Sequence, residues 1–180
     1  ISKMDDDMAK RFFITHFFNP PRYMRLVEII SSIKTDMKLI PPMAEFLEDA
    51  LGKGVVYAKD TPNFIANRIG VYGMMVTLDE ARNKNLSIED VDALTGSLIG
   101  RPKSATFRTS DIVGLDTMCF VANTAYEKCT EDVEREIFKI PDYLQKMVDS
   151  GWLGQKSGQG FYKKIDKGVI HSIDLETLEY

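Results

Sequence analysis

Apolar and turn-forming residues divide the first part of the chain into short segments. Residues 12–18 (FFITHFF) are aromatic and favour β-structure without a helical period, so they predict a buried strand. Pro20 and Pro21 then force a turn, because proline fixes φ and cannot donate a backbone hydrogen bond. Residues 26–30 (LVEII) predict a second strand that follows this turn.

A helix and a third strand complete this part. Pro41 suits the first turn of a helix that runs to about residue 51, where Gly52 ends it. Residues 54–58 (GVVYA) predict a short strand. The first sixty or so residues are therefore an αβ piece, which is too small to be a doubly wound domain by itself.

The pattern becomes helical after residue 62, with apolar residues every three to four positions over residues 64–83. Ser87 followed by Asp90 predicts a capping box that opens a helix to about residue 98. Further helices are expected over residues 109–126, 132–137 and 141–150. Residues 154–160 form a glycine-rich turn, and residues 163–180 alternate only weakly, as a connector to further chain would.

Composition describes an ordinary globular protein with 44% apolar and 28% charged residues. The net charge of −4 does not favour nucleic acid or an anionic membrane as a partner. The start resembles no signal peptide, and its first residue, Ile1, is interpreted as a cut inside a longer, cytoplasmic protein. Cys119 and Cys129 lack the spacing of a zinc site and are expected to be reduced thiols, so no metal is predicted.

His16 is the first candidate for chemistry, because it lies in the middle of the first predicted strand. If the turn centres on Arg22, opposed residues of an antiparallel hairpin have numbers that add to 44, and His16 then faces Glu28. Glu28 is the one charge in its strand, and a buried carboxylate needs a partner such as an imidazole N–H. Such a pair would orient the ring and raise its basicity, although a purely structural hydrogen bond explains the pair equally well.

Other polar residues leave two interpretations open. Asn67 is a poor helix former on a predicted helix, and could be either a satisfied core amide or a substrate ligand. Asn19 by default is a turn residue, and Lys156 is most simply a solvated lysine of the glycine-rich turn. His171 is given no role, and the chain has neither GxGxxG nor GxxxxGK[ST], so it should not hold a dinucleotide firmly by itself.

These segments together resemble the 3-hydroxyacyl-CoA dehydrogenase family over almost the whole chain. Each motif is weak alone, but all occur in order at compatible spacing. The motifs are residues 16–20 (HFFNP), 24–29 (MRLVEI), 64–68 (FIANR), 111–116 (DIVGLD) and 156–162 (KSGQGFY).

The resemblance implies a function for several of these residues. His16 would be the base that takes the proton of the substrate's 3-hydroxyl while hydride leaves for NAD, and Glu28 would orient it. Asn67 would bind the substrate oxygen. Asn19 and Lys156 match family positions near the nicotinamide end of the cofactor. The substrate class would be (S)-3-hydroxyacyl-CoA, oxidised in fatty-acid β-oxidation.

The resemblance also implies an architecture, which is mainly α. Residues 1–59 would be the last α/β elements of a Rossmann domain, and residues 60–164 a helical domain of the 3-hydroxyacyl-CoA/6-phosphogluconate dehydrogenase type. Residues 165–180 would be a linker to a further domain. The family pairs through its helical domain, so a homodimer is expected by analogy.

Two departures from the family pattern stand out. Asn63 replaces the usual glycine before Phe64, and asparagine is the next best residue at positive φ. Residues 100–108 (GRPKSATFR) resemble the versions of the family that are fused to an enoyl-CoA hydratase. The alternatives are a non-catalytic helical dimerisation module that retains the site residues, and, less favoured, a sugar-acid dehydrogenase of the same architecture.

Overall fold

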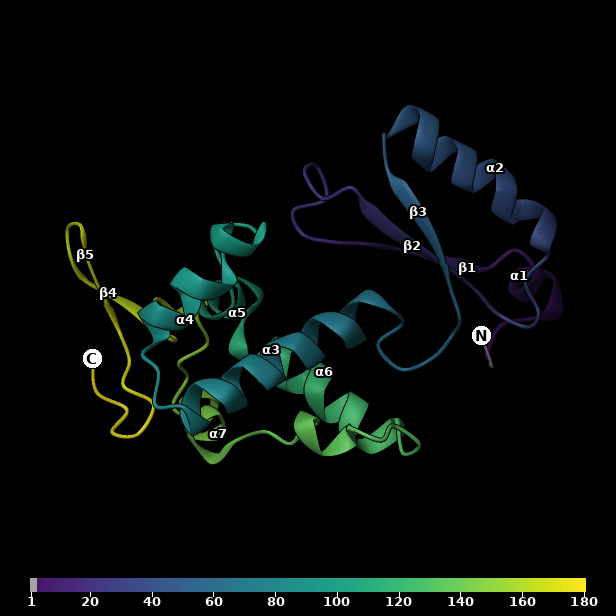
Figure 1. Ribbon diagram of the computed structural model, residues 1–180. Helices are drawn as coiled ribbons and strands as arrows, with labels where there is room; N and C mark the ends of the chain where they lie inside the picture. Colours follow the sequence, from purple (N-terminus) through teal and green to yellow (C-terminus); the bar gives the residue numbers. More distant parts are fainter. Residues whose placement is uncertain (1–2) are drawn as a thin grey trace. The chain divides into compact units, whose positions relative to one another are not determined.

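The computed structural model describes residues 3–180, so Ile1 and the interpretation placed on it lie outside the described residues. The chain divides into two compact units, of which the first ends at Ile65 and the second begins at Ala66. Each unit is described by itself, with its elements labelled in Figure 1.

The first unit is built on a three-stranded sheet in the order β1-β2-β3. Its strands are β1 (Phe13–Phe17), β2 (Leu26–Ser31) and β3 (Gly54–Ala58), close to the three predicted strands. β1 and β2 are antiparallel, and every pair in their register adds to 44, as predicted. β3 runs parallel to β2.

Two helices accompany this sheet. The predicted helix over residues 41–51 is present as α2 (Ile40–Glu45), with a 3₁₀ turn before it (Met37–Leu39) and a π-helical turn after it (Phe46–Ala50). Gly52 follows at φ 62°, in agreement with its predicted role. The pattern did not predict the short helix α1 (Asp6–Lys10). Asp5 caps it, because its side chain accepts a hydrogen bond from Met8 N.

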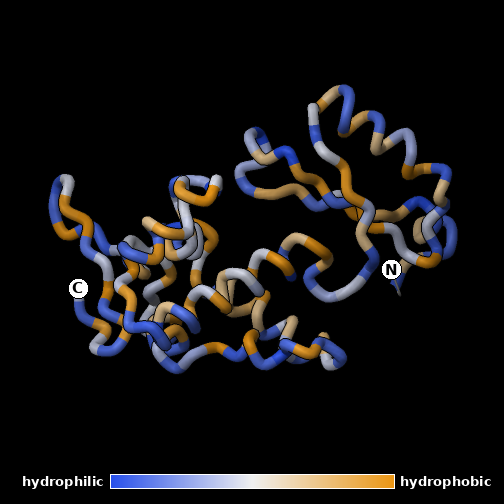
Figure 2. The backbone as a smooth tube through the Cα atoms, in the orientation of Figure 1, coloured by the Kyte–Doolittle hydropathy of each residue, from blue (hydrophilic) through white to orange (hydrophobic). Residues whose placement is uncertain are grey.

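The core of the first unit lies between β2 and α2. Val27 and Ile29 pack against buried residues of α2 and the turn after it: Ile40, Ala44 and Leu47. Successive strand residues point to opposite faces, so Glu28 points away from this core. In Figure 2 the strands of this sheet are coloured as largely apolar along their length.

The second unit begins with its longest helix, α3 (Ala66–Asn83). The apolar period had placed the helix start at residue 64, but Asn63 and Phe64 both have positive φ, which an α-helix excludes. Ser87 caps α4 (Ile88–Thr95) by accepting from Asp90 N, which confirms the predicted capping box. A 3₁₀ turn, Ser97–Ile99, completes the segment expected to be helical up to residue 98.

The helix expected over residues 109–126 is two helices. α5 (Phe107–Val113) and α6 (Leu115–Lys128) are separated by Gly114, whose φ of 98° breaks the helical path. The helix expected over 132–137 is only a 3₁₀ turn, Arg135–Phe138. α7 (Asp142–Asp149) matches the last predicted helix, and Gly151 follows it at φ 76°.

The tail is more ordered than the connector expected from its pattern. β4 (Tyr162–Asp166) and β5 (Val169–Ser172) form an antiparallel hairpin. Ile173 is buried in the core of the second unit, and Leu175 and Tyr180 pack against that core. These contacts give the tail a structural role in the second unit, because burial of Ile173 and partial burial of the other two side chains stabilise its position.

The core of the second unit joins all of its α-helices, and its largest fully buried side chains include Phe107, Met118, Phe138 and Phe161. Helical segments cover about half of the chain, while strands form the small sheet and the hairpin. The expectation of a mainly α protein therefore holds for the second unit and not for the first. Among the described residues, no helix combines the length and apolarity needed to cross a membrane.

Candidate active site

His16 and Glu28 face each other on β1 and β2, as the pairing of the strands predicted. The distance between His16 Nδ1 and Glu28 Oε2 is 2.7 Å, which is a short hydrogen bond of the kind charged partners form. The Glu28 residue is 0% exposed, whereas the His16 side chain is 27% exposed. The carboxylate is therefore held in the protein interior, and the imidazole can be approached from outside the sheet.

Glu28 also accepts a hydrogen bond from the backbone N–H of Ile65, at 3.0 Å from Oε1. This bond helps to orient the carboxylate toward the ring. A carboxylate accepts, so the His16 nitrogen that faces it must carry the proton. The neutral ring is then protonated on Nδ1, which leaves Nε2 with the lone pair that a base requires.

Aromatic rings restrict the His16 imidazole on two sides. The ring centroids of Phe18 and Phe64 lie 4.6 Å and 5.6 Å from that of His16, both in tilted arrangements. Phe64 has φ 51°, and Asn63 has φ 62°, as expected of an asparagine that replaces glycine there. The left-handed conformation of Phe64 is costly for a bulky residue, and it is found here beside the candidate base.

Asn19 lies just after the end of β1 and is exposed, in the turn that the two prolines form. Lys53 holds this turn, because its ammonium donates to the carbonyls of Pro21 and Met24, the latter at 2.8 Å. Lys53 was not recognised from the sequence, since its partners lie about thirty positions earlier in the chain. The turn therefore has a defined anchor close to Asn19.

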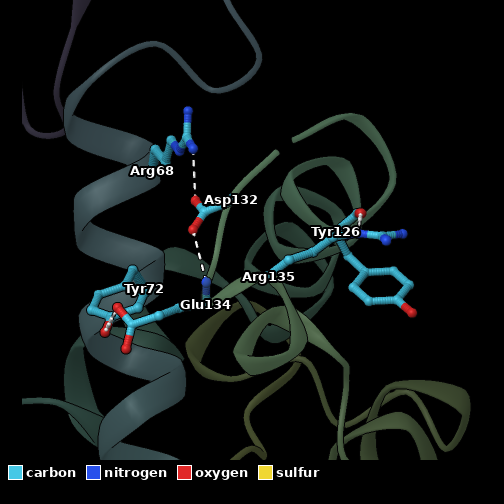
Figure 3. A network of polar contacts seen from close by, with 6 residues as sticks. All are labelled: Arg68, Tyr72, Tyr126, Asp132, Glu134 and Arg135. Carbon is cyan, nitrogen blue, oxygen red and sulfur yellow. Dashed lines mark hydrogen bonds and ion pairs between the residues drawn. The ribbon is translucent and has the colours of Figure 1, made fainter. Parts of the chain in front are cut away.

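Asn67 belongs to the second unit, where it lies half-buried in the first turn of α3. Figure 3 shows the polar contacts that hold this end of the helix. Arg68 donates to Asp132 at 2.6 Å, and Tyr72 donates to Glu134 at 2.6 Å. The hydrogen bond from Arg68 lowers the pKa of Asp132, which keeps that carboxylate ionised. These contacts attach the first two turns of α3 to the segment that contains Asp132 and Glu134.

Lys156 also belongs to the second unit, in the 3₁₀ turn Gln155–Ser157. Its ammonium lies 2.7 Å from Asp116 Oδ2, so it is an ion-paired lysine and not simply a solvated one. The hydrogen bond from Lys156 lowers the pKa of Asp116. His16 and Glu28 are thus brought together within the first unit, whereas Asn67 and Lys156 occupy separate places in the second.

Asp111 has a larger role in the second unit than its predicted position inside a helix suggested. It is 4% exposed, and burial raises its pKa to about 6. Its two carboxylate oxygens accept from the backbone N–H groups of Phe161 and Tyr162, at 2.8 and 2.9 Å. The sequence placed this carboxylate in one of the five motifs. It did not indicate what the carboxylate binds, because the partners are about fifty positions later in the chain.

Comparison with known proteins assigns both units to one class, dehydrogenases that have an NAD-binding domain followed by a separate C-terminal domain. Residues 1–61 match the model of the 3-hydroxyacyl-CoA dehydrogenase NAD binding domain, and residues 64–164 match that of the 3-hydroxyacyl-CoA dehydrogenase C-terminal domain. The chain belongs to the 3-hydroxyacyl-CoA dehydrogenase family. This confirms the resemblance that the five motifs indicated.

Individual relatives agree with this assignment. A "Probable 3-hydroxyacyl-CoA dehydrogenase" of Bacillus subtilis (strain 168) is 54% identical over 175 residues, which is 97% of this chain and 22% of that protein. A Rickettsia felis protein named as a fatty acid oxidation complex trifunctional enzyme is 33% identical, covering 98% of this chain and 25% of its own length. The crystal structure of M. tuberculosis FadB2 has a TM-score of 0.75 at 33% identity, over 86% of this chain and 53% of that one. The chain therefore spans about a fifth to a half of these relatives.

Proposed function

We propose that the polypeptide containing this chain oxidises (S)-3-hydroxyacyl-CoA to 3-oxoacyl-CoA with NAD, in fatty-acid β-oxidation. The observation that carries the proposal is the 2.7 Å contact between His16 Nδ1 and the buried Glu28 carboxylate. In the neutral ring this contact requires the proton on Nδ1, so Nε2 carries the lone pair. The His16 side chain is also more exposed than that of Glu28. Membership of the family supports the substrate class, acyl-CoA thioesters, and the cofactor.

His16 acts as the general base in this proposal. Its Nε2 takes the proton of the 3-hydroxyl group while the C3–H bond breaks and the C3=O bond forms. NAD, when bound, supplies the chemistry of hydride acceptance. Glu28 stabilises the imidazolium that His16 becomes, because its negative charge lies at hydrogen-bond distance from Nδ1 in a water-poor environment. In the reverse direction His16 returns the proton.

Asn67 supports the reaction in this proposal by donating its amide N–H to the substrate oxygen. The contacts of Arg68 and Tyr72 in Figure 3 restrain the first two turns of α3, which supports a positioned amide at Asn67. An interaction of this kind strengthens as negative charge develops on the oxygen, so it favours the transition state.

NAD would be held at its nicotinamide end by Asn19 and Lys156. Asn19 is exposed just beyond the end of β1, and its amide has both the donor and the acceptor that a carboxamide requires. Lys156 supplies a cation whose position Asp116 restrains. These residue types fit that end of the cofactor. The 180 residues contain no glycine-rich phosphate loop, so the proposal assigns them no role at the pyrophosphate.

The domain assignment remains part of the proposal. We assign residues 1–59 to the end of the NAD-binding domain and 60–164 to the helical domain. Residues 165–180, which pack on the core of the second unit, are assigned to the segment that connects it to a further domain. The division of the chain after Ile65 supports the first boundary. A fused enoyl-CoA hydratase is proposed by analogy with the trifunctional relative, and a homodimer through the helical domain by analogy with the family.

The test is NADH oxidation with acetoacetyl-CoA by the whole polypeptide that carries this chain. Loss of a positioned general base should lower kcat by about 10²- to 10⁴-fold in His16→Ala. His171→Ala is the matched control, because His171 is exposed in β5 and should retain full activity. Rapid wild-type turnover that collapses only in His16→Ala supports the proposal. A folded wild type that binds NADH without turnover supports the non-catalytic module instead.

A further inference from the structure

Two sequence motifs that are forty positions apart form one structure in the second unit. The first motif, residues 111–116, spans the break between α5 and α6 at Gly114. The second, residues 156–162, belongs to the glycine-rich turn and the start of β4. The backbone N–H of Leu115 donates to the carbonyl of Leu153 at 3.3 Å, so the helix break and the chain entering the turn are in direct contact.

Asp111 binds the chain where it leaves the turn. Its Oδ1 accepts from Phe161 N at 2.8 Å, and its Oδ2 accepts from Tyr162 N at 2.9 Å. Hydrogen bonds to a charged, buried acceptor are stronger than neutral ones. Both oxygens thus hold the same two-residue segment, which Phe161 also anchors by its complete burial.

Two glycines allow the turn to close on Asp111. A Cβ atom at Gly160 would lie 2.1 Å from Asp111 Oδ1, and a Cβ atom at Gly154 would lie 2.3 Å from the Asp111 carbonyl oxygen. No side chain fits at either distance. Gly154 N also donates to the carbonyl of Gln159 at 2.8 Å, which joins the two ends of the turn. Both ends therefore meet at a single residue of α5.

Lys156 lies between these two ends, and its ammonium is 2.7 Å from Asp116 Oδ2. Asp116 is in the first turn of α6, five positions after Asp111. The geometry has two parts: Asp111 determines where the backbone of the turn lies, and Asp116 determines where the lysine ammonium lies. If the backbone moved away from Asp111, the ammonium could not keep its place beside Asp116.

We infer that Asp111 is a positioning residue, whose carboxylate holds the turn 154–160 and thereby places Lys156 for the nicotinamide end of the dinucleotide cofactor. The inference rests on the proposed function, in which Lys156 binds there. Asp111 itself touches no cofactor, because its oxygens face the backbone of Phe161 and Tyr162. Its effect on the reaction is expected to pass through Lys156.

A double-mutant cycle in the whole polypeptide tests this inference. The variants are Asp111→Asn, Lys156→Ala and the combination, and the readouts are KM for NADH and kcat with acetoacetyl-CoA. An asparagine amide would turn its NH₂ group toward one of two N–H donors, so it disrupts the hold on the turn while keeping the size of the side chain. We expect each single variant to raise KM for NADH at least five-fold, and the double variant to raise it no further than Lys156→Ala. Residues that act as a unit show this non-additivity.

Gly160→Ala provides a second route to the same displacement, because its Cβ pushes the turn from Asp111 without changing any charge. If Asp111→Asn fails to fold, KM for NADH of Gly160→Ala tests whether displacing the turn weakens cofactor binding. Asp166→Asn is the control, since Asp166 is exposed in β4 and is expected to leave KM unchanged. Trp152, the one tryptophan of the chain, lies two positions before Gly154, so its emission reports whether the turn has moved in folded variants.

The outcomes separate the inference from the proposed function. If Lys156→Ala raises KM for NADH while folded Asp111→Asn and Gly160→Ala stay within two-fold of wild type, the inference is wrong. It is also wrong if Asp111→Asn raises KM further in the Lys156→Ala background. If Lys156→Ala itself has no effect, the cofactor role of Lys156 and the inference fall together. The proposal for His16 is decided independently by the His16→Ala comparison.

Discussion

Replacing Glu28 by glutamine should separate the role of the His16–Glu28 pair from the role of the fold. Glutamine has nearly the same shape, so the packing of the buried residue at this position is kept. The carboxylate accepts from His16 Nδ1 at 2.7 Å and from Ile65 N at 3.0 Å. An amide has one acceptor oxygen and one NH₂ donor. Its oxygen can therefore accept from one of these two donors, and its NH₂ group must then face the other.

The expected size follows from the two arrangements that the amide can adopt. If its NH₂ group faces His16, the ring must protonate on Nε2 and loses its basic nitrogen. If the NH₂ group faces Ile65, two donors oppose each other in a buried place, at a cost of about 1–3 kcal/mol. In either arrangement the neutral amide also removes the charged hydrogen bond that stabilises the imidazolium, which contributes about 1.5–3 kcal/mol. At about 1.4 kcal/mol for each factor of ten, its loss in the transition state lowers kcat roughly 10- to 150-fold.

The assay is NADH oxidation with acetoacetyl-CoA by the whole polypeptide, with kcat and KM measured beside a far-UV spectrum and a melting curve. Glu45→Gln is the matched control, because Glu45 is an exposed glutamate of α2 in the same unit. We expect kcat to fall while KM for both substrates changes little. A folded Glu28→Gln enzyme with kcat within two-fold of wild type would refute the role given to this carboxylate.

Three further predictions concern stability, and each is checked by denaturant or thermal unfolding. Phe107→Ala removes a fully buried ring that packs edge-on against Phe161 at 4.7 Å, and should cost about 3–5 kcal/mol; a loss under 1 kcal/mol would contradict the packing. Ser87→Ala removes the cap of α4 and should cost about 1 kcal/mol, whereas Ser87→Thr, which keeps the hydroxyl, should restore most of it. Burial raises the pKa of Asp111 from 3.8 to about 6, so its contribution to stability is fully present below the lower value and is lost as pH rises through about 6. Between pH 4 and 7 the stability of wild type relative to Asp111→Asn should therefore fall, by up to about 3 kcal/mol. Asp116→Asn should show the opposite sign, because the hydrogen bond from Lys156 lowers the pKa of Asp116 and its contribution is lost in acid; equal slopes for both variants would refute this account.

The local pattern of the chain was sufficient for the three strands of the first unit and for the central pair of the site. The register of a two-strand hairpin is fixed once its turn is placed. A turn centred on Arg22 therefore determined that His16 faces Glu28. The capping box at Ser87 was also predictable, because it depends on neighbouring residues alone. The positive φ of Asn63 agrees with the glycine that the family usually has at this position. The five motifs identified the family, which the family models confirm.

Other features depended on contacts that no local pattern contains. The apolar period continues across Gly114, yet the helix breaks there at a φ of 98°. Asp111 and Asp116, on the two sides of the break, bind residues fifty and forty positions later in the chain. The period also began at Phe64, but this residue adopts positive φ beside the His16 ring. The weak alternation of the tail gave no sign that Ile173 would be buried.

The sequence by itself therefore determined the three strands of the first unit, the register of the hairpin and the family. Only the tertiary structure decided which carboxylates are buried and what they bind, as for Asp111 with Phe161 and Tyr162 and for Glu28 with Ile65. The physical reason is that local propensities amount to about 1 kcal/mol or less per residue, while a buried carboxylate without partners costs several times more. The chain therefore adopts an arrangement in which those buried carboxylates have partners.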